Sequence, residues 1–324
     1  MTLYAFSPEE LFVTAMFSRW ETVGNSPLSL VEAAVPDLKD DKVVDECVKS
    51  LIGTGMLLVK NDGSIIPSRE ADMFLRVLQN PDQMIQVSRS GLANMKDYFL
   101  CSYGNLWCIY SCTTDGRLHC VNFPVLKENL PEWFKSDILS DFKPDVSQKA
   151  RMDFTLSLME NLLLQCAQNV YAARANNKAP LSEDDLWFTP ADLYGHPDLK
   201  SILLSFPLYC STGQLEELEK EIGSMDKWEG SLLQMAKRGI LVTRKNSDGT
   251  TRFSYGDMLK EWLNPGGLVD VVFIGQTIPE ARSRILYMKR NGYLILEQAN
   301  DAIRYKSVRG DTDYISLAYG ILDF

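Results

Sequence analysis

Histidine is scarce in this chain, and the patterns that mark catalytic sites are absent from it. Only two histidines occur among 324 residues, His119 and His196. The sequence has no Gly-x-Ser-x-Gly turn, no phosphate-binding loop and no dinucleotide-binding glycine motif. Acid–base and nucleophilic catalysis usually needs a group that titrates near neutral pH. We therefore expect a protein that is not an enzyme and that uses no cofactor.

Long apolar runs, excess positive charge and a cysteine framework are also missing. No apolar run reaches the roughly 18 residues that cross a bilayer, and residues 1–11 (MTLYAFSPEEL) lack the features of a secretory signal. The formal charge of -10 argues against binding to nucleic acid or to an anionic membrane. Seven cysteines at irregular spacing suit a reducing compartment. These features predict a cytoplasmic protein without stable membrane insertion.

What the sequence does contain is an internal repetition. Three blocks recur in the same order at nearly constant spacing. The matched pairs are 7–14 (SPEELFVT) with 182–189 (SEDDLWFT), 51–63 (LIGTGMLLVKNDG) with 235–249 (MAKRGILVTRKNSDG), and 68–81 (SREADMFLRVLQNP) with 254–265 (SYGDMLKEWLNP). Because two copies are too few for a solenoid, we predict an α+β fold made of two halves related by a pseudo-two-fold axis.

Each half is predicted to contain N-terminal helices, a hairpin with an Asp-Gly turn and an antiparallel β-meander. In the first half Ser7 caps the first helix, Gly55 ends the next one, and Asp62-Gly63 forms the hairpin turn. The meander strands are expected at 84–88, 96–101, 107–113 and 117–123 in the first half, and at 269–275, 284–289, 293–298 and 303–307 in the second.

The second half repeats these signals after a helical connector. Ser182 is expected to start its first helix and Ser254 its last one, with Asp248-Gly249 at the hairpin turn. A long helix is expected at about 147–176, with Phe154 on its apolar face. The predicted boundaries are 1–143 for the first half, 144–178 for the connector and 179–324 for the second half, and we expect these parts to pack as one compact unit.

Cys108, Cys112, His119 and Cys120 come nearest to a metal-ligand set. Structural zinc sites usually pair ligands two to four residues apart on turns. On a strand, Cys108 and Cys112 would share a face but lie about 13 Å apart, at roughly 3.3 Å per residue. Since cysteine is among the most buried residue types, we interpret these residues as part of a sheet core and predict no metal site.

Aromatic residues are concentrated in the predicted first sheet and in the segment that closes the first half. Apolar residues occupy both faces of the strand around 107–110, so both faces must be covered. The cover is expected to come from the other half on one face and from the long helix on the other, or in part from a protein partner. The predicted partner-binding residues are Tyr103, Trp107, Tyr110, Asp115 and Trp133.

The helix, glycine and hairpin also resemble the second half of a winged helix, a fold that often binds DNA. A recognition helix should be basic, yet the helix before Gly55 carries Asp45 and Glu46. A winged-helix-like transcriptional regulator, or another protein-interaction module, is therefore the alternative hypothesis.

Residues 3–125 carry a succession of short motifs. They are LYAFSPEEL at 3–11, LIGTG at 51–55, LLVKNDGSIIP at 57–67 and ADMFLRVL at 71–78. This succession resembles the EspG-like family of type VII (ESX) secretion-associated chaperones. The resemblance implies a pseudo-two-fold α+β fold and a cytosolic, non-enzymatic chaperone that keeps helical substrates soluble for export. The implied partner is a secreted helical protein of the PE–PPE, WXG100 or LXG-toxin type, and the chain is expected to be a monomer or a homodimer.

Overall fold

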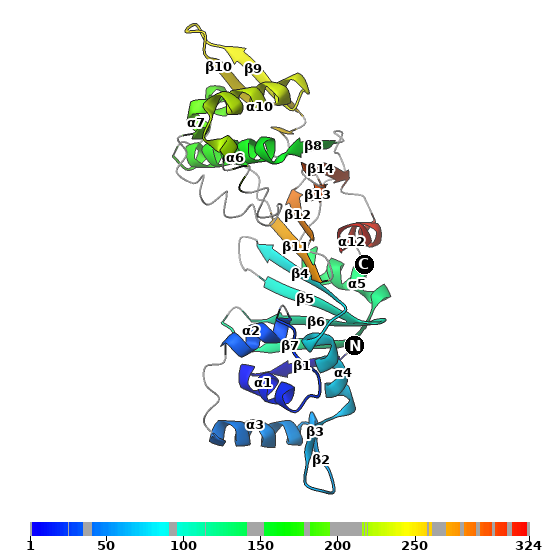
Figure 1. The fold of residues 1–324 in the computed structure, drawn as a ribbon. Coiled ribbons are helices and arrows are strands. Elements are labelled where there is room, and N and C mark those ends of the chain that lie inside the picture. Colours follow the sequence, from blue (N-terminus) through cyan, green and yellow to red (C-terminus); the bar gives the residue numbers. More distant parts are fainter. Residues whose placement is uncertain are drawn as a thin grey trace. The chain divides into compact units, whose positions relative to one another are not determined.

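The chain folds into two units that each combine helices with strands (Figure 1). Unit 1 comprises Met1–Asp141, Val272–Ala281 and Asp313–Phe324, and unit 2 comprises Phe142–Val271 and Arg282–Thr312. The computed structural model describes residues 2–24, 26–34, 41–90, 96–113, 115–140, 152–177, 182–194, 216, 218, 220–257, 259–260, 270–278, 282–289, 292–299, 302–309 and 313–322.

Unit 1 is built around a sheet of order β1-β7-β6-β5-β4-β11. The strands are β1 (Thr2–Phe6), β4 (Gln83–Ser90), β5 (Lys96–Tyr103), β6 (Leu106–Cys112), β7 (His119–Leu126) and β11 (Asp270–Ile278). From β4 to β7 each strand pairs antiparallel with the next, and β1 pairs antiparallel with β7, with Phe6 opposite His119. The predicted meander of the first half is therefore confirmed.

Four helices of unit 1 precede its meander, and α4 packs against β5 and β6. They are α1 (Pro8–Met16), α2 (Pro27–Ala34), α3 (Asp41–Gly53) and α4 (Arg69–Gln79), with the hairpin β2 (Leu57–Val59) and β3 (Ile65–Pro67) between α3 and α4. The core centres on Phe74, whose ring lies 5.5 Å from that of Tyr4, 5.8 Å from Phe6 and 6.4 Å from Phe123. The segments that close the two sequence halves are helical, as α5 (Leu130–Trp133), a π-helical turn (Phe134–Ile138) and α12 (Tyr314–Leu322).

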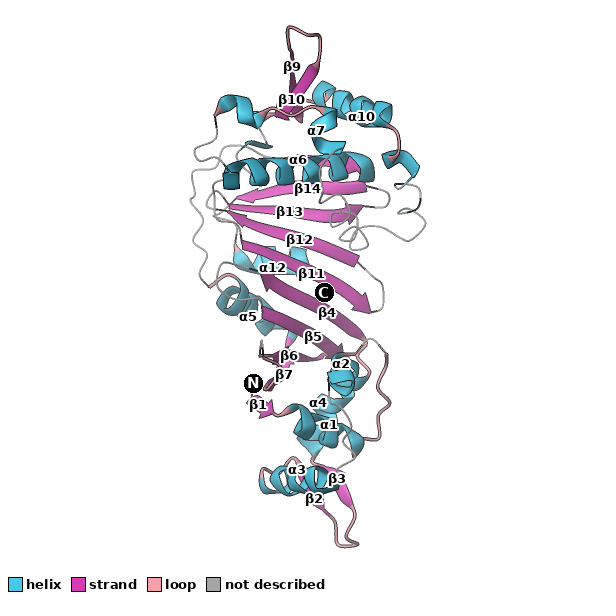
Figure 2. Cartoon of the chain, turned by 90° about the vertical axis from the view of Figure 1, so that its left-hand side faces the viewer, coloured by secondary structure: helices cyan, strands magenta, loops and turns pink. Residues whose placement is uncertain are grey.

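Unit 2 contains strands in the order β12-β13-β14-β8 and a layer of helices beside them. The strands are β8 (Asp153–Ser157), β12 (Arg282–Lys289), β13 (Gly292–Ala299) and β14 (Ala302–Arg309). The helix α6 (Leu158–Asn177) runs beside β14, with α7 (Pro190–Tyr194) and α10 (Met225–Lys237) beyond it (Figure 2). The hairpin β9 (Leu241–Lys245) and β10 (Thr251–Tyr255) follows α10, and Trp228, Tyr171, Phe188 and Phe253 are fully buried in the core.

The long helix expected at about 147–176 starts only at Leu158, so the prediction is wrong for residues 153–157. These residues form β8, which pairs antiparallel with β14. Phe154 stacks on Tyr305 with ring centroids 5.3 Å apart, and Leu156 is fully buried. The apolar pattern of this segment fits a helix face and a strand face equally well, and pairing with a strand distant in sequence decided between them.

The repeated helix, glycine stop and hairpin are confirmed in both units. Gly55 after α3 has φ +76 and Gly239 after α10 has φ +73, the left-handed conformation that glycine adopts without a Cβ penalty. Their N–H groups donate to Ile52 and Ala236 at 3.1 and 3.0 Å. In the hairpin turns, the carboxylates of Asp62 and Asp248 each accept a backbone N–H two residues on at 2.9 Å.

Two predicted helix starts in the second half differ from expectation. Ser182 does begin a capped turn, but only the short 3₁₀ segment Glu183–Leu186 follows it. The strand, serine and helix seen at Ser7 recur instead at Ser157, whose N–H donates to Glu160 at 2.9 Å before α6. Ser254 lies inside β10, and a helical turn starts after Gly256, whose carbonyl accepts from Leu259 at 2.9 Å. At Ser254 no helix can begin, because the pairing of β10 with β9 extends one residue beyond it, to Tyr255.

Candidate functional site

Three of the five residues predicted to contact a partner are buried inside unit 1. Trp107 and Tyr110 lie on β6 with 3% of their surface exposed, and Trp133 in α5 is also buried, in edge-to-face contact with Tyr98 at 5.3 Å. The covering that both faces of this strand require comes from the chain itself. These three side chains therefore contribute to the core and offer no contact surface.

Tyr103 and Asp115 are exposed, and each is held by its own surroundings. The ring of Tyr103 lies 3.9 Å from the guanidinium of Arg76, which also stacks on Trp20 at 4.9 Å. Asp115 accepts from the Thr113 hydroxyl at 2.6 Å and from the backbone N–H of Arg117 at 3.2 Å. The bond from Thr113 is the main reason why the pKa of Asp115 is lowered. Both residues shape hairpin ends, and both remain available on the surface.

The predicted cysteine and histidine group is divided between different environments. Cys108 is fully buried, and burial raises the pKa of its thiol. His119 lies opposite Cys112, with Nε2 3.9 Å from the thiol sulfur, and its Nδ1 is 2.6 Å from the Tyr110 hydroxyl. Cys120 is paired with Ser111 in the same ladder. Within the described ranges, no three His, Cys, Asp or Glu side chains converge in a way that would hold a metal ion; His196 lies outside those ranges.

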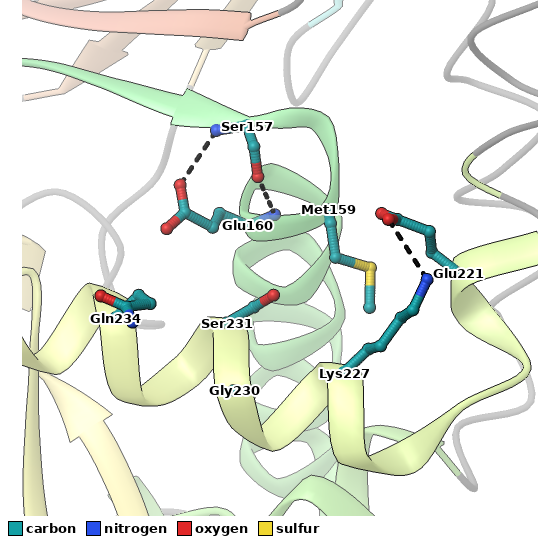
Figure 3. A pocket seen from close by; sticks show the side chains of 8 residues that line it. All are labelled: Ser157, Met159, Glu160, Glu221, Lys227, Gly230, Ser231 and Gln234. Atoms are coloured by element: carbon teal, nitrogen blue, oxygen red, sulfur yellow. Dashed lines mark hydrogen bonds and ion pairs between the residues drawn. The ribbon is translucent and has the colours of Figure 1, made fainter.

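An open hollow of about 450 Å³ lies in unit 2, between the start of α6 and the middle of α10 (Figure 3). Met159 lies on the α6 side, and Gly230 and Ser231 lie on the α10 side. A Cβ added at Gly230 would meet nothing within 4 Å. The small side chains of α10 therefore leave space next to a methionine, whose flexible thioether adapts to the shape of a ligand.

Ion pairs line both sides of this hollow. Glu160 is nearly buried, closes the capping box of α6, and accepts from Arg238 at 2.8 Å. On the other side Lys227 and Glu221 form an ion pair at 3.4 Å (Figure 3). Most of the described lining residues are polar or charged, and Met159, the apolar side chain among them, is 4% exposed. The sequence analysis missed this site; the Gly230-Ser231 pair within an otherwise regular helical pattern was the available signal.

A second exposed apolar surface lies on the β2–β3 hairpin of unit 1, which projects beyond α3 and α4 (Figure 1). Leu58 is 47% exposed and Val59 is 56% exposed. Their cross-strand partners are Ile66 and Ile65, so every position of the ladder is apolar. In an isolated two-stranded hairpin, one face normally carries polar residues.

Comparison with known proteins gives a fold similarity. No family model and no curated protein matches the sequence. The structure is similar to the Mycobacterium tuberculosis type VII secretion system chaperone EspG5, solved in complex with a PE25–PPE41 dimer. The similarity covers 99% of this chain and 96% of that one, with 11% identity and a TM-score of 0.44. Among the described helices, none is long and apolar enough to span a membrane.

Proposed function

We propose that this chain is a non-enzymatic cytoplasmic chaperone or adaptor for a type VII secretion system. It binds the helical tip of a secreted substrate and keeps that substrate soluble for export. The resemblance of residues 3–125 implies a substrate of the PE–PPE type, with WXG100 and LXG-toxin proteins as the other classes. The observation that carries the proposal is the hollow between α6 and α10.

The hollow suits an apolar side chain presented at the end of a helix hairpin. Met159 is only 4% exposed, so a side chain that enters beside Gly230 covers mainly the aliphatic parts of the other lining residues. Apolar surface removed from water stabilises the complex by about 25 cal/mol per Å² before the costs of association. The ion pairs Glu160–Arg238 and Glu221–Lys227 are already formed in the free chain. Binding therefore leaves no charged group at the border without its partner.

The variant Gly230→Leu tests this site, because the new side chain would fill the hollow from within α10. Leucine is a better helix former than glycine and the position has open space, so the variant is expected to fold. We expect it to bind a purified helical substrate heterodimer of the host's type VII system about tenfold more weakly, or about 1.4 kcal/mol. Isothermal titration calorimetry measures the dissociation constant.

Gly320→Leu in α12 is the matched control, because an added Cβ there also meets nothing within 4 Å and the site is in unit 1. Its affinity should equal that of the wild-type chain. If Gly230→Leu bound the substrate as tightly as the wild-type chain, the hollow would not be the binding site. Purification of the tagged chain from its host without any secretion substrate or machinery component would contradict the function itself.

A further inference from the structure

The strand β1 stands last in the strand order of unit 1, and among the described residues nothing protects its outer edge against pairing with another chain. In the strand order it has β7 on one side and stands last on the other. Antiparallel geometry directs the N–H and C=O groups of alternate residues toward that free side. Thr2, Leu3 and Ala5 are exposed, and Leu3 is 61% exposed. The strand sequence TLYAF contains no charged residue and no proline.

In unit 2, the strand β8 also stands last in the strand order, and its edge is protected. Like β1, β8 ends its strand order and leads through a serine capping box into a helix. It begins with the charged Asp153, whose two carboxylate oxygens accept from Nε and Nη2 of Arg304 in a bidentate ion pair, each at 2.8 Å. The backbone carbonyl of Thr155 accepts from Arg238 at 3.1 Å. Charged side chains and side-chain caps are established means of blocking an edge, and the part of the chain that the structure describes supplies neither to β1.

We propose that β1 is a binding edge for an extended segment of another protein, which adds to the sheet as a further strand. In this mode the main chain supplies the hydrogen bonds and alternate side chains supply the specificity. This surface is separate from the hollow in unit 2 and takes a different kind of ligand, a strand in place of a helix tip. The proposal therefore does not depend on the proposed function.

The side chains around β1 define the chemistry of the segment. Leu3 and Ala5 lie on one face of the strand, and a partner strand should place small or β-branched apolar residues beside them. On the other face the Tyr4 hydroxyl donates to the exposed carboxylate of Glu70 at 3.0 Å. A lysine or arginine on that face of the segment would meet this carboxylate. The partner is thus an apolar, alternating segment with one basic residue.

A fluorescent peptide of alternating valine and threonine with one central lysine is the probe, and fluorescence anisotropy measures its binding to the full chain. We expect saturable binding that weakens about tenfold in the variant Leu3→Lys, because a lysine on an edge opposes strand addition. Met16→Lys on α1 is the matched control, since Met16 is 59% exposed and receives the same charge. Its affinity should not change.

Two further comparisons separate strand addition from nonspecific adhesion. A peptide with prolines at alternate positions lacks the required N–H groups and should not bind. Replacing the central lysine of the valine–threonine peptide by glutamate should weaken its binding to the wild-type chain. The variant Glu70→Lys should instead prefer the glutamate peptide. Failure of every peptide to bind would overturn the proposal. So would equal losses in Leu3→Lys and Met16→Lys, or a concentration-dependent dimer in sedimentation that Leu3→Lys abolishes, because the occupant would then be a second copy of the chain.

Discussion

His119 is enclosed by its own hairpin in unit 1. The Tyr110 hydroxyl lies 2.6 Å from Nδ1, and the Cys112 sulfur lies 3.9 Å from Nε2. Burial lowers the pKa of His119 from its usual 6.5, while a hydrogen bond with the backbone of Gly116 and the carboxylate of Glu9 act in the opposite direction with smaller effect. The ring is therefore held in its neutral form, and it serves to fix the end of the β6–β7 hairpin.

This environment predicts a specific pH dependence of stability. Because the folded pKa lies below the unfolded one, the unfolded chain binds more protons once the pH falls below about 6.5. The free energy of unfolding should therefore decline as the pH falls from 6.5 toward the folded pKa. His119→Gln should lose this part of the decline in urea titrations at several pH values. Tyr110→Phe, the control, should lower stability at every pH but keep the decline; an unchanged profile in His119→Gln would refute the assignment.

At the scale of elements, the helix, glycine and hairpin unit is the recurring part of the fold. In unit 2 its last residue, Gly256, donates its N–H to the carbonyl of Ile240 at 2.9 Å and so joins the hairpin back to the end of α10. A Cβ at Gly256 would lie 2.4 Å from the carbonyl oxygen of Gly239. Backbone cannot move aside as a flexible side chain can, so only glycine fits this contact.

The two glycines of this unit should respond in opposite ways to alanine. Gly256→Ala is expected to lower the free energy of unfolding by about 1–3 kcal/mol, because the methyl group overpacks against backbone. Gly230→Ala in α10 has open space and should raise stability by about 0.5–1 kcal/mol through helix propensity. Urea denaturation followed by circular dichroism measures both. A similar effect of the two substitutions would mean that the close backbone contact at Gly256 does not determine its response to alanine.

At the scale of the whole molecule, charge separates the proposed function from the winged-helix alternative. The chain has a formal charge of -10. The helix α3, which precedes the β2–β3 hairpin as a recognition helix would, exposes Glu46 and contains Asp41 and Asp45. Phosphate contacts supply most nonspecific DNA affinity and require lysine and arginine. The apolar β2–β3 hairpin is equally unsuited to a phosphate backbone.

We therefore expect no DNA binding even where electrostatic attraction is strongest. Genomic DNA fragments should migrate unchanged in a gel-shift experiment at low salt with an excess of the chain. A basic winged-helix protein of similar size is the positive control. A shift that disappears as salt is added would instead be the signature of phosphate contacts, and it would favour the regulator over the chaperone.

Local signals in the sequence determined the turns, the caps and most of the strands. Ser7, Gly55 and Asp62-Gly63 act through backbone conformations that a few neighbouring residues settle among themselves, so they could be predicted. The same holds for the meander strands, whose positions the structure confirms. The pseudo-two-fold relation of the halves stays a prediction, since the structure describes each unit by itself.

Tertiary structure alone decided which residues are covered and which segments meet. Composition marks Trp107 and Leu58 alike as apolar, but the first is buried inside unit 1 while the second is exposed on a hairpin. The hollow exists because α6 and α10, far apart in sequence, pack with Gly230 between them, and β8 is a strand because β14 lies beside it. Burial and pairing depend on contacts between distant segments, and local conformational preference does not contain that information.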